Sequence, residues 1–304
     1  MVRKTWRRLD VQISELARFP AAVLELSRRE SKVANGRQQA VEPGTIISLT
    51  TFPPRAGTVH YTLRSLLTQD TLPESIVLVI ARDEFGSMPL PQRLRSMVQG
   101  KLQILEIERS LSSYNKIIPV LECFPNHTIV TCDDDKIYPA DWFGSLVKAS
   151  KLEPETIICH FARELPLHIA EHYPDYPKWR QADQYILAMN LLPLGVGGVL
   201  YPPGSLHADS CRANLFMELA PCADDLWLRF MSLRTGTPVR RLDRYRRHPE
   251  SIPTTWKLRL SHGNVWENEN VASFRRLLAL YEAELSDLNV IRPSAPHHAS
   301  QAIF

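Results

Sequence analysis

Three neighbouring carboxylates are the feature of this sequence that most directly suggests chemistry. Asp133, Asp134 and Asp135 follow the apolar, β-branched stretch T-I-V-T-C. Like charges this close disfavour the ionised form unless a positive charge lies among them. A solvated turn, with one aspartate capping the helix expected near Pro139, is one interpretation. The other is a hard divalent cation, because Mg2+ and Mn2+ prefer oxygen ligands and are commonly shared with substrate phosphates. Three acids in a row favour the metal.

A second acidic pair lies at the start of a helix expected over residues 224–235. Carboxylates at a helix N-terminus are stabilised by the helix dipole. That explains one of Asp224 and Asp225 as a cap but does not explain both. The other carboxylate of the pair therefore needs a role besides capping.

The elements that must position these acids alternate between strand and helix signals. Apolar, β-branched runs predict strands, and segments of helical periodicity separate them. The alternation predicts an α/β protein with a mostly parallel central sheet flanked by helices. In such sheets ligands bind at the carboxyl ends of the strands, which is where the aspartate triplet falls. The expected strands are 45–50, 75–81, 102–107, 128–132 and 239–242, and the expected helices are 59–69, 91–99, 113–123, 224–235 and 271–285.

Residues 1–43 read as an N-terminal helical extension, 44–290 as the main domain and 291–304 as a flexible tail. The first turns are basic and are followed by apolar residues at helical spacing. Such a helix can lie on an anionic membrane surface, or it can pack on the domain or on a partner subunit. Pro20 predicts a kink or a break in it.

Composition narrows the class of protein. The 304 residues carry a net charge of +3, which is too small to indicate nucleic acid as a partner. Five cysteines, an odd number at wide spacings, favour reduced thiols over a disulfide framework. No apolar run reaches the roughly 18 residues of a membrane span, and no signal-peptide pattern opens the chain. We therefore expect a cytoplasmic protein. If the N-terminal helix binds lipid, the protein would be peripherally bound at the inner face of the membrane.

Five motifs together resemble those of GT-A glycosyltransferases of the bacterial family 2-like type. The triplet D-D-D resembles their D-x-D motif, and I-S-L-T-T-F-P-P-R resembles their first strand and nucleotide-side loop. S-Y-N-K-I-I-P-V-L resembles the helix before the D-x-D strand, and G-V-G-G-V-L-Y-P-P-G the acceptor-side glycine loop. C-A-D-D-L-W-L-R-F-M resembles the second acidic motif. The resemblance covers roughly residues 44–285.

The resemblance implies a GT-A fold and a metal-dependent, inverting transfer of a sugar. The donor would be a nucleotide diphosphate sugar, the acceptor a hydroxyl of a glycan or glycolipid, and the setting surface polysaccharide or lipopolysaccharide assembly. Mn2+ or Mg2+ would be bound by Asp135 with Asp133. Asp133 would also face the donor ribose or sugar, and Asp134 would lie between these roles. Asp225 would be the base. Asp224 remains an alternative base, because the family pattern is usually Glu-Asp whereas this sequence has Asp-Asp.

The resemblance also implies roles for residues whose alternatives are purely structural. Lys116 and Arg55 would meet the nucleotide or diphosphate, or they are ordinary surface cations. The glycine loop, with Gly195, Gly197 and Gly198, would let backbone approach the acceptor, or it is a plain turn. Aromatic and histidine candidates complete the set. Tyr176 and Trp179, near Tyr173, would stack on sugar rings or close a core, and His262 would be a late metal ligand or diphosphate contact or a structural histidine.

Three other functions remain open. The stretch H-I-A-E-H matches a zinc-peptidase pattern, in which His168, Glu171 and His172 would form a metallohydrolase site. The prolines on both sides leave little room for the helix that such a site needs. A catalytically inactive GT-A-like protein that binds a sugar or nucleotide is the second alternative. A nucleotidyltransferase is the third, but its first loop is usually glycine-rich, whereas T-T-F-P-P-R has no glycine.

Overall fold

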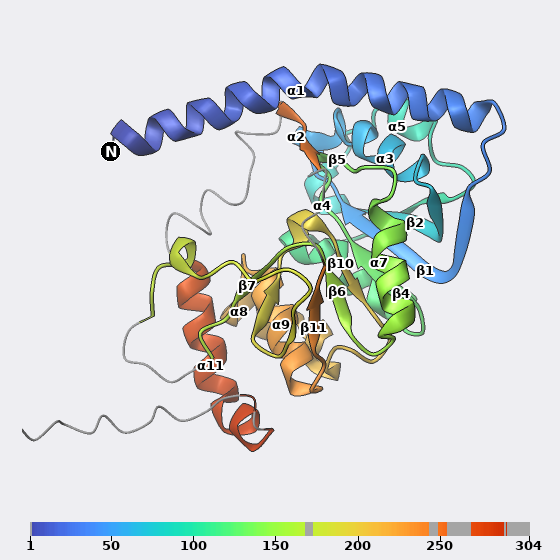
Figure 1. Cartoon of the computed structure of the whole chain (residues 1–304). Coiled ribbons are helices and arrows are strands. Elements are labelled where there is room, and N and C mark those ends of the chain that lie inside the picture. The colour runs from blue at the N-terminus through green and yellow to red at the C-terminus, as the bar shows by residue number, and fades with distance from the viewer. Residues whose placement is uncertain (1, 168–172, 243–248, 254–268, 289, 291–304) are drawn as a thin grey trace, which may run out of the picture.

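The structure, a computed structural model, describes residues 2–167, 173–242, 249–253, 269–288 and 290, with residues 2–13 described by their backbone. Its centre is an eight-stranded sheet in the order β3-β2-β1-β4-β10-β6-β11-β8 (Figure 1). Neighbours from β3 to β4 are parallel, and β10 is antiparallel to both of its neighbours. The strands are β1 (Ala40–Thr50), β2 (Thr71–Ala81), β3 (Leu102–Ile107), β4 (Thr128–Thr131), β6 (Ile157–Cys159), β8 (Leu187–Ala188), β10 (Val199–Tyr201) and β11 (Val239–Arg241). The expected α/β class with a mostly parallel sheet is confirmed.

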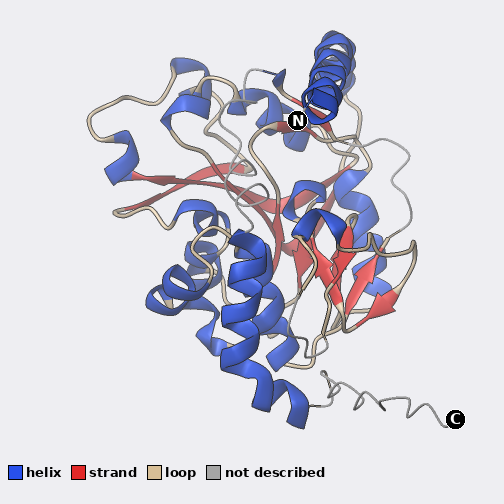
Figure 2. Ribbon diagram, turned by 90° about the vertical axis from the view of Figure 1, so that its left-hand side faces the viewer, coloured by secondary structure: helices blue, strands red, loops and turns tan. Residues whose placement is uncertain are grey.

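The strands form here because both faces of the sheet are covered. Alternate residues of β1 point to opposite faces, so Ile47 and Leu49 join one apolar cluster and Ile46 joins another. Burial on both sides explains why these strands are nearly continuous apolar runs. Figure 2 shows helices on both sides of the sheet.

Two groups of helices supply that cover. α3 (Val59–Leu67) and α7 (Trp142–Leu152) pack on the cluster around Ile47. α8 (Ala213–Leu219), α9 (Asp224–Arg234) and α11 (Glu269–Asp287) pack on the larger cluster of the opposite face. The remaining elements are short: α2 (Pro53–Ala56), α4 (Arg82–Phe85), α5 (Gln92–Arg95), α6 (Ile118–Cys123), η1 (Ser112–Lys116), η2 (Tyr176–Lys178), η3 (Gly195–Gly197), η4 (Ala208–Cys211), β5 (Lys136–Ile137), β7 (Ala162–Glu164), β9 (Leu191–Pro193) and β12 (Glu250–Ser251).

Three expected elements differ from the structure. The first strand begins at Ala40 rather than at residue 45, so the last residues assigned to the N-terminal extension pair with β2, across a register shift between Glu42 and Ile46. The helix expected over 91–99 is a single turn, α5. The helix expected over 113–123 divides into η1 and α6, because Pro119 has no N–H to bond the preceding turn.

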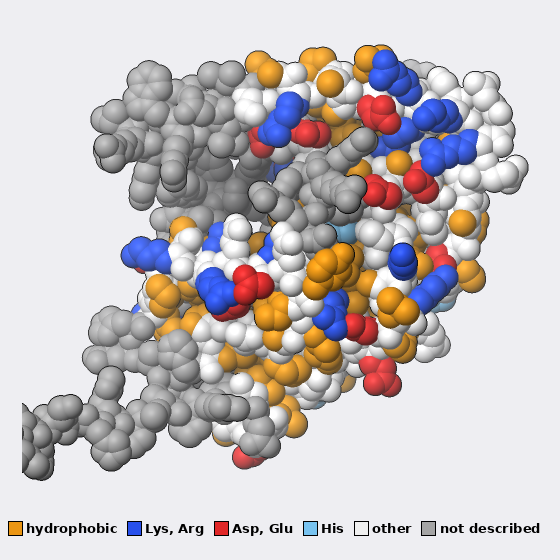
Figure 3. All heavy atoms as spheres, viewed as in Figure 1, with side chains coloured by type: hydrophobic (Ala, Val, Ile, Leu, Met, Phe, Trp, Pro, Cys, Tyr) orange, Lys and Arg blue, Asp and Glu red, His pale blue; other side chains and the backbone are white. Residues whose placement is uncertain are grey.

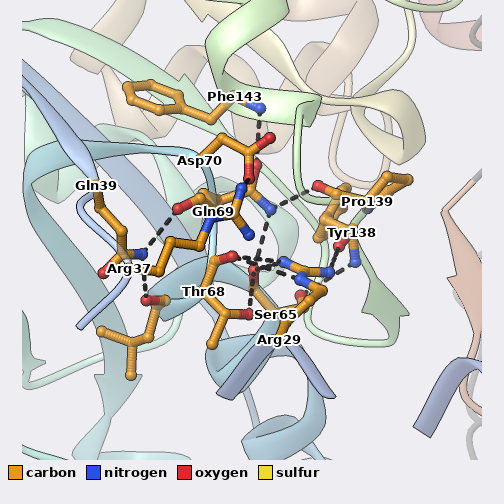
Figure 4. Close-up of polar contacts among 11 residues, drawn as sticks. Arg29, Arg37, Gln39, Ser65, Thr68, Gln69, Asp70, Tyr138, Pro139 and Phe143 are labelled. Atoms are coloured by element: carbon orange, nitrogen blue, oxygen red, sulfur yellow. Dashed lines mark hydrogen bonds and ion pairs between the residues drawn. The ribbon is translucent and has the colours of Figure 1, made fainter. Parts of the chain in front are cut away.

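The N-terminal extension is one continuous helix, α1 (Val2–Ala34), which passes through Pro20. Its last turns are fixed to the domain by Arg29, a buried side chain that donates to three backbone carbonyls (Figure 4). These belong to Ser65 at 2.7 Å, Tyr138 at 2.8 Å and Thr68 at 3.2 Å. Glu30 adds a second link, because its carboxylate accepts two hydrogen bonds at 2.6 Å from Arg64 of α3. One guanidinium therefore ties α1, α3 and the segment that follows the aspartate triplet.

Replacing Arg29 with Met should lower the free energy of unfolding by about 2–4 kcal/mol, because it leaves buried carbonyls without their donor. Urea unfolding followed by circular dichroism measures this. Arg28→Met is the matched control, since Arg28 lies on the exposed side of the same helix, and it should change the stability by less than about 0.5 kcal/mol. Equal effects of the two variants would contradict the anchoring role of Arg29.

The outer side of α1 carries apolar and charged side chains together. Leu16 and Leu24 are 58% and 53% exposed, and Arg18 and Lys32 are exposed beside them. Figure 3 shows orange and blue side chains along the upper edge, where α1 lies. Within the described chain, no helix combines the length and apolar character needed to cross a bilayer. Contact of α1 with a membrane surface stays a prediction.

Candidate active site

Segments from both halves of the chain meet at one edge of the sheet. The parallel strands β1 and β4 end there, at Thr50 and Thr131. Because β10 runs antiparallel to β4, its first residue, Val199, lies at the same edge. The turn η3, which precedes β10, is therefore brought to the aspartate triplet that follows β4.

Two adjoining cavities open at this edge. One, of about 340 Å3, is lined by residues of η3, the triplet and the start of α9. The other, of about 270 Å3, lies beside the end of β1 and is lined by Thr50, Thr51 and Phe52. Both are lined by the same four side chains, Arg55, Ser113, Lys116 and Asp133. Together they form one cleft with Asp133 and Lys116 at its centre.

The middle aspartate of the triplet is held by the protein. Asp134 accepts hydrogen bonds from Arg55 Nη1 at 2.6 Å and from Thr51 Oγ1 at 2.7 Å, one on each carboxylate oxygen. Its backbone carbonyl accepts from Thr62 at 2.8 Å. Burial raises the pKa of Asp134 to about 6, although Arg55 opposes the rise. Asp134 thus fixes the loop, and Asp133 and Asp135 remain as the carboxylates directed at the larger cavity.

Asp133 and Asp135 have cations near them at longer range. Lys116 Nζ lies 3.4 Å from Asp133, while Arg55 Nη2 and Lys136 Nζ lie 3.7 and 3.6 Å from Asp135. Burial raises the pKa of Asp133, but Lys116, Lys136 and Arg55 together outweigh it and hold the pKa below its ordinary value. The backbone N–H of Asp133 donates to the Tyr138 hydroxyl at 2.9 Å. The repulsion within the triplet is therefore met in part by three protein cations.

Lys116 connects the two acidic groups. Its ammonium lies 3.0 Å from Asp224 and 3.4 Å from Asp133, and its side chain is buried. Burial lowers the pKa of Lys116, but Asp224, Asp133 and Asp225 raise it more, so it stays charged. The interpretation of Lys116 as a surface lysine is excluded by its burial. The same holds for Arg55, which is also buried.

The two acids at the start of α9 have different surroundings. Asp224 is paired with Lys116, whereas both oxygens of Asp225 accept from the Gly195 N–H at 3.2 Å. Burial, and then the charge of Asp224, raise the pKa of Asp225 to about 7. A carboxylate whose pKa lies near neutral is suited to accept a proton at physiological pH. The geometry therefore distinguishes Asp225, the expected base, from Asp224, the alternative that the sequence left open.

The cleft has more acidic than basic side chains. Its lining includes six acids, namely the triplet, Asp224, Asp225 and Glu84, against three cations, Arg55, Lys116 and Lys136. No three described His, Cys, Asp or Glu side chains are arranged to hold a metal ion by themselves. Two carboxylates, Asp133 and Asp135, would suffice for a cation that takes its remaining oxygens from phosphate and water. The acid excess and this oxygen donor set fit Mg2+ or Mn2+.

The glycine loop contacts the site through Gly195. A Cβ on Gly195 would lie 3.1 Å from Lys116 Nζ and 3.2 Å from the Asp225 carboxylate. The other two predicted glycines, Gly197 and Gly198, lie farther along the turn and pack on aromatic rings. A Cβ there would come within 2.2 Å of Phe161 and 2.3 Å of Trp142 respectively, and Gly198 has a φ of +89°. Close packing accounts for both of these glycines, and their acceptor role stays a prediction.

Of the two aromatic candidates, one lines the cavity and the other packs beneath it. Tyr176 lines the larger cavity, whereas Trp179 packs between Tyr176 and Phe274 and donates to Pro174 O. Trp179 therefore belongs to the core beneath the site.

His262, the predicted metal ligand, and His168, Glu171 and His172 of the zinc alternative lie outside the described residues.

Sequence reasoning missed Lys136 and the segment behind it. Lys136 directly follows the triplet and donates to Ser251 Oγ at 2.8 Å, and Ser251 donates to Glu15 of α1 at 2.9 Å. β12, which contains Ser251, pairs with β5, and the N–H of Ile252 donates to Asp135 O. The sequence signal for Lys136 was its position directly after three acids. No sequence signal indicated its partner Ser251, which lies more than a hundred residues farther along the chain.

Comparisons with known proteins give fold-level likenesses only. The sequence matches no protein-family model and no curated protein. Among solved structures, 4-diphosphocytidyl-2C-methyl-D-erythritol synthase aligns at 10% identity and a TM-score of 0.35, over 58% of this chain and 80% of that one. Residues 1–349 of Staphylococcus aureus TarS, in complex with UDP, align at 11% identity and a TM-score of 0.43. That alignment covers 67% of this chain and 59% of TarS 1–349.

Proposed function

We propose that this protein is a glycosyltransferase that moves a sugar from a nucleotide diphosphate donor to a hydroxyl of a glycan or glycolipid. The observation that carries the proposal is the convergence of two acidic motifs on one buried lysine, at the carboxyl ends of β1 and β4. The triplet and the Asp224–Asp225 pair are distant in sequence. Their meeting in one cleft is what a reaction needs when it stabilises a leaving group and deprotonates an acceptor.

The donor fits the side of the cleft beside β1. That cavity is lined by Arg55 and Lys116, which would face the negative charge of a diphosphate, and by Thr50, Thr51 and Phe52. Fixed cations directed at a departing diphosphate stabilise it more in the transition state than in the ground state. Arg55 is itself fixed by Asp134, so its guanidinium is oriented before the donor arrives.

The acceptor hydroxyl would be deprotonated by Asp225. Its pKa of about 7 lets it take a proton near neutral pH, and the Gly195 N–H orients its carboxylate. Asp224 would hold Lys116 rather than act as base, because the two are ion-paired at 3.0 Å. A base on the acceptor side and a leaving group on the donor side favour a single displacement, with inversion at the anomeric carbon.

Asp133 and Asp135 would hold Mg2+ or Mn2+ in this proposal. When bound, the metal would neutralise charge on the diphosphate leaving group. Surface polysaccharide or lipopolysaccharide assembly is the setting that the sequence resemblance suggests.

A nucleotide screen tests the proposal. Purified protein is incubated with UDP-, GDP-, ADP-, CDP- and dTDP-sugars, with Mn2+ or with EDTA, and release of the nucleoside diphosphate is measured. We expect slow, metal-dependent release from donors of one base, faster once a suitable acceptor is added. Absence of both release and nucleotide-dependent thermal stabilisation with every donor would contradict the proposal, and stabilisation by Zn2+ alone would turn attention to His168 and His172.

A further inference from the structure

A third cavity adjoins the catalytic cleft and differs from it in charge. It has a volume of about 450 Å3 and meets the larger catalytic cavity at Lys136, Leu194 and Val196, which line both. Its other walls include Phe161, Gln181 and Arg241. No acidic side chain lines it within the described part of the chain, whereas the catalytic cleft has an excess of acids.

Arg241 is the basic side chain that has no evident structural task in this cavity. Its Nε is buried without a hydrogen-bond partner. No described carboxylate lies within ion-pairing distance of its guanidinium, which is in contrast with Arg240, the preceding residue of β11. Arg240 points to the other face, where it bonds Glu153 at 3.0 Å and Tyr185 O at 2.6 Å.

Arg241 is half-buried, and its buried Nε is an N–H donor without a partner, which is costly unless a ligand supplies an acceptor. Arginine presents a planar fork of donors that matches the oxygens of a phosphate or a carboxylate. Lys136 lines both cavities, but its ammonium is engaged by Asp135 and Ser251, so the charge available to a ligand in the third cavity is that of Arg241. The chemistry favoured in this cavity is therefore an oxyanion.

Building on the proposed glycosyl transfer, we infer that the acceptor is an anionic sugar whose phosphate or carboxylate binds Arg241 in this third cavity. The acceptor would span the junction at Val196, with its oxyanion near Arg241 and its reacting hydroxyl near Asp225. The difference in charge between the two cavities would fix its orientation, because an acceptor oxyanion turned toward Asp224 and Asp225 would be repelled. Gln181, at the exposed rim, could donate an amide N–H to the same group.

Binding of simple sugars tests this inference directly. Isothermal titration with glucose 6-phosphate, glucuronate and methyl glucoside compares a phosphate, a carboxylate and a neutral sugar. We expect the wild type to bind one of the two anions at least about tenfold more tightly than methyl glucoside. Arg241→Gln should lose that preference and Arg241→Lys should keep part of it, because lysine retains the charge without the fork. Arg240→Gln is the matched control and should keep the full preference.

The phosphate and carboxylate arms identify which oxyanion the site takes. Equal binding of charged and neutral sugars by the wild type, no binding of any of them, or an anion preference unchanged in folded Arg241→Gln would overturn the inference. Release of nucleoside diphosphate from the donor without acceptor is followed in the same variants. If the wild type binds the anion but releases no nucleotide, the glycosyltransferase proposal fails and the oxyanion site stands. If nucleotide is released but charged and neutral sugars bind equally, the oxyanion site fails and the glycosyltransferase proposal stands.

Discussion

Asp225→Asn is expected to lower kcat for sugar transfer by about 10^2 to 10^4-fold, the usual contribution of a general base. Asparagine has nearly the same shape and can still contact the Gly195 N–H, but it cannot take a proton. Donor affinity should change little, because the donor cavity beside β1 does not include this residue. Initial rates with saturating donor, together with titration of the nucleoside diphosphate, separate the two effects.

Asp224→Asn is the matched comparison for that variant. It removes the carboxylate paired with Lys116 and should weaken donor binding, since it disturbs the lysine that faces the donor. Normal transfer by Asp225→Asn would refute the assignment of the base. Normal donor affinity in Asp224→Asn would show that the ion pair with Lys116 is not needed to orient the lysine.

The same Asp225→Asn substitution should stabilise the protein above neutral pH. The folded state keeps a proton on Asp225 up to about pH 7, whereas the unfolded chain releases it near 3.8. Between these values the folded state binds more protons, so the free energy of unfolding falls as the pH rises. Asparagine has no proton to release in this range, so the variant does not lose this part of its free energy of unfolding. We expect a higher Tm for Asp225→Asn at pH 8 and a much smaller difference from the wild type at pH 4.

Asp135→Asn should abolish the metal-dependent part of donor binding. It removes one of the two carboxylates proposed to hold Mn2+ and leaves Asp133 alone. In a thermal-shift assay, donor at 100 times its Kd stabilises the wild type by about 2.7 kcal/mol, which is a shift of several degrees. With Mn2+ present, the mutant should show only the smaller shift that the wild type shows in EDTA.

Asp183→Asn controls for loss of a negative charge, because Asp183 is an exposed acid whose side chain is 72% accessible. It should retain the full Mn2+-dependent shift. A full shift in Asp135→Asn as well would show that Asp135 is not a metal ligand, even if the nucleotide proposal holds.

The sheet was largely predictable from the sequence, because burial on both faces leaves long apolar runs. The strand over 102–107 matches β3, and the helix expected over 224–235 differs from α9 by one residue. The helices expected over 91–99 and 113–123 were overestimated. Periodicity could not indicate that Pro119 would divide one of them.

The site was predictable in its residue types but not in its pairings. Asp133, Lys116 and Asp224 were each recognised as candidates, yet nothing in the sequence indicates that one ammonium lies between two carboxylates about ninety residues apart. Asp134 and Asp135 are neighbours with the same side chain. Only the position of Thr51 and Arg55 makes one of them structural and directs the other to the cavity. Gly195 and Gly197 were equivalent until the contacts of each were known.

The attachment of α1 has a consequence for the order in which the chain can assemble during synthesis. The helix comes first in sequence, but the carbonyls that Arg29 contacts belong to residues 65, 68 and 138, and the partner of Glu15 is Ser251. A ribosome must therefore produce most of the domain before α1 can dock. Until then its apolar inner face stays uncovered in the nascent chain, where a chaperone could bind it.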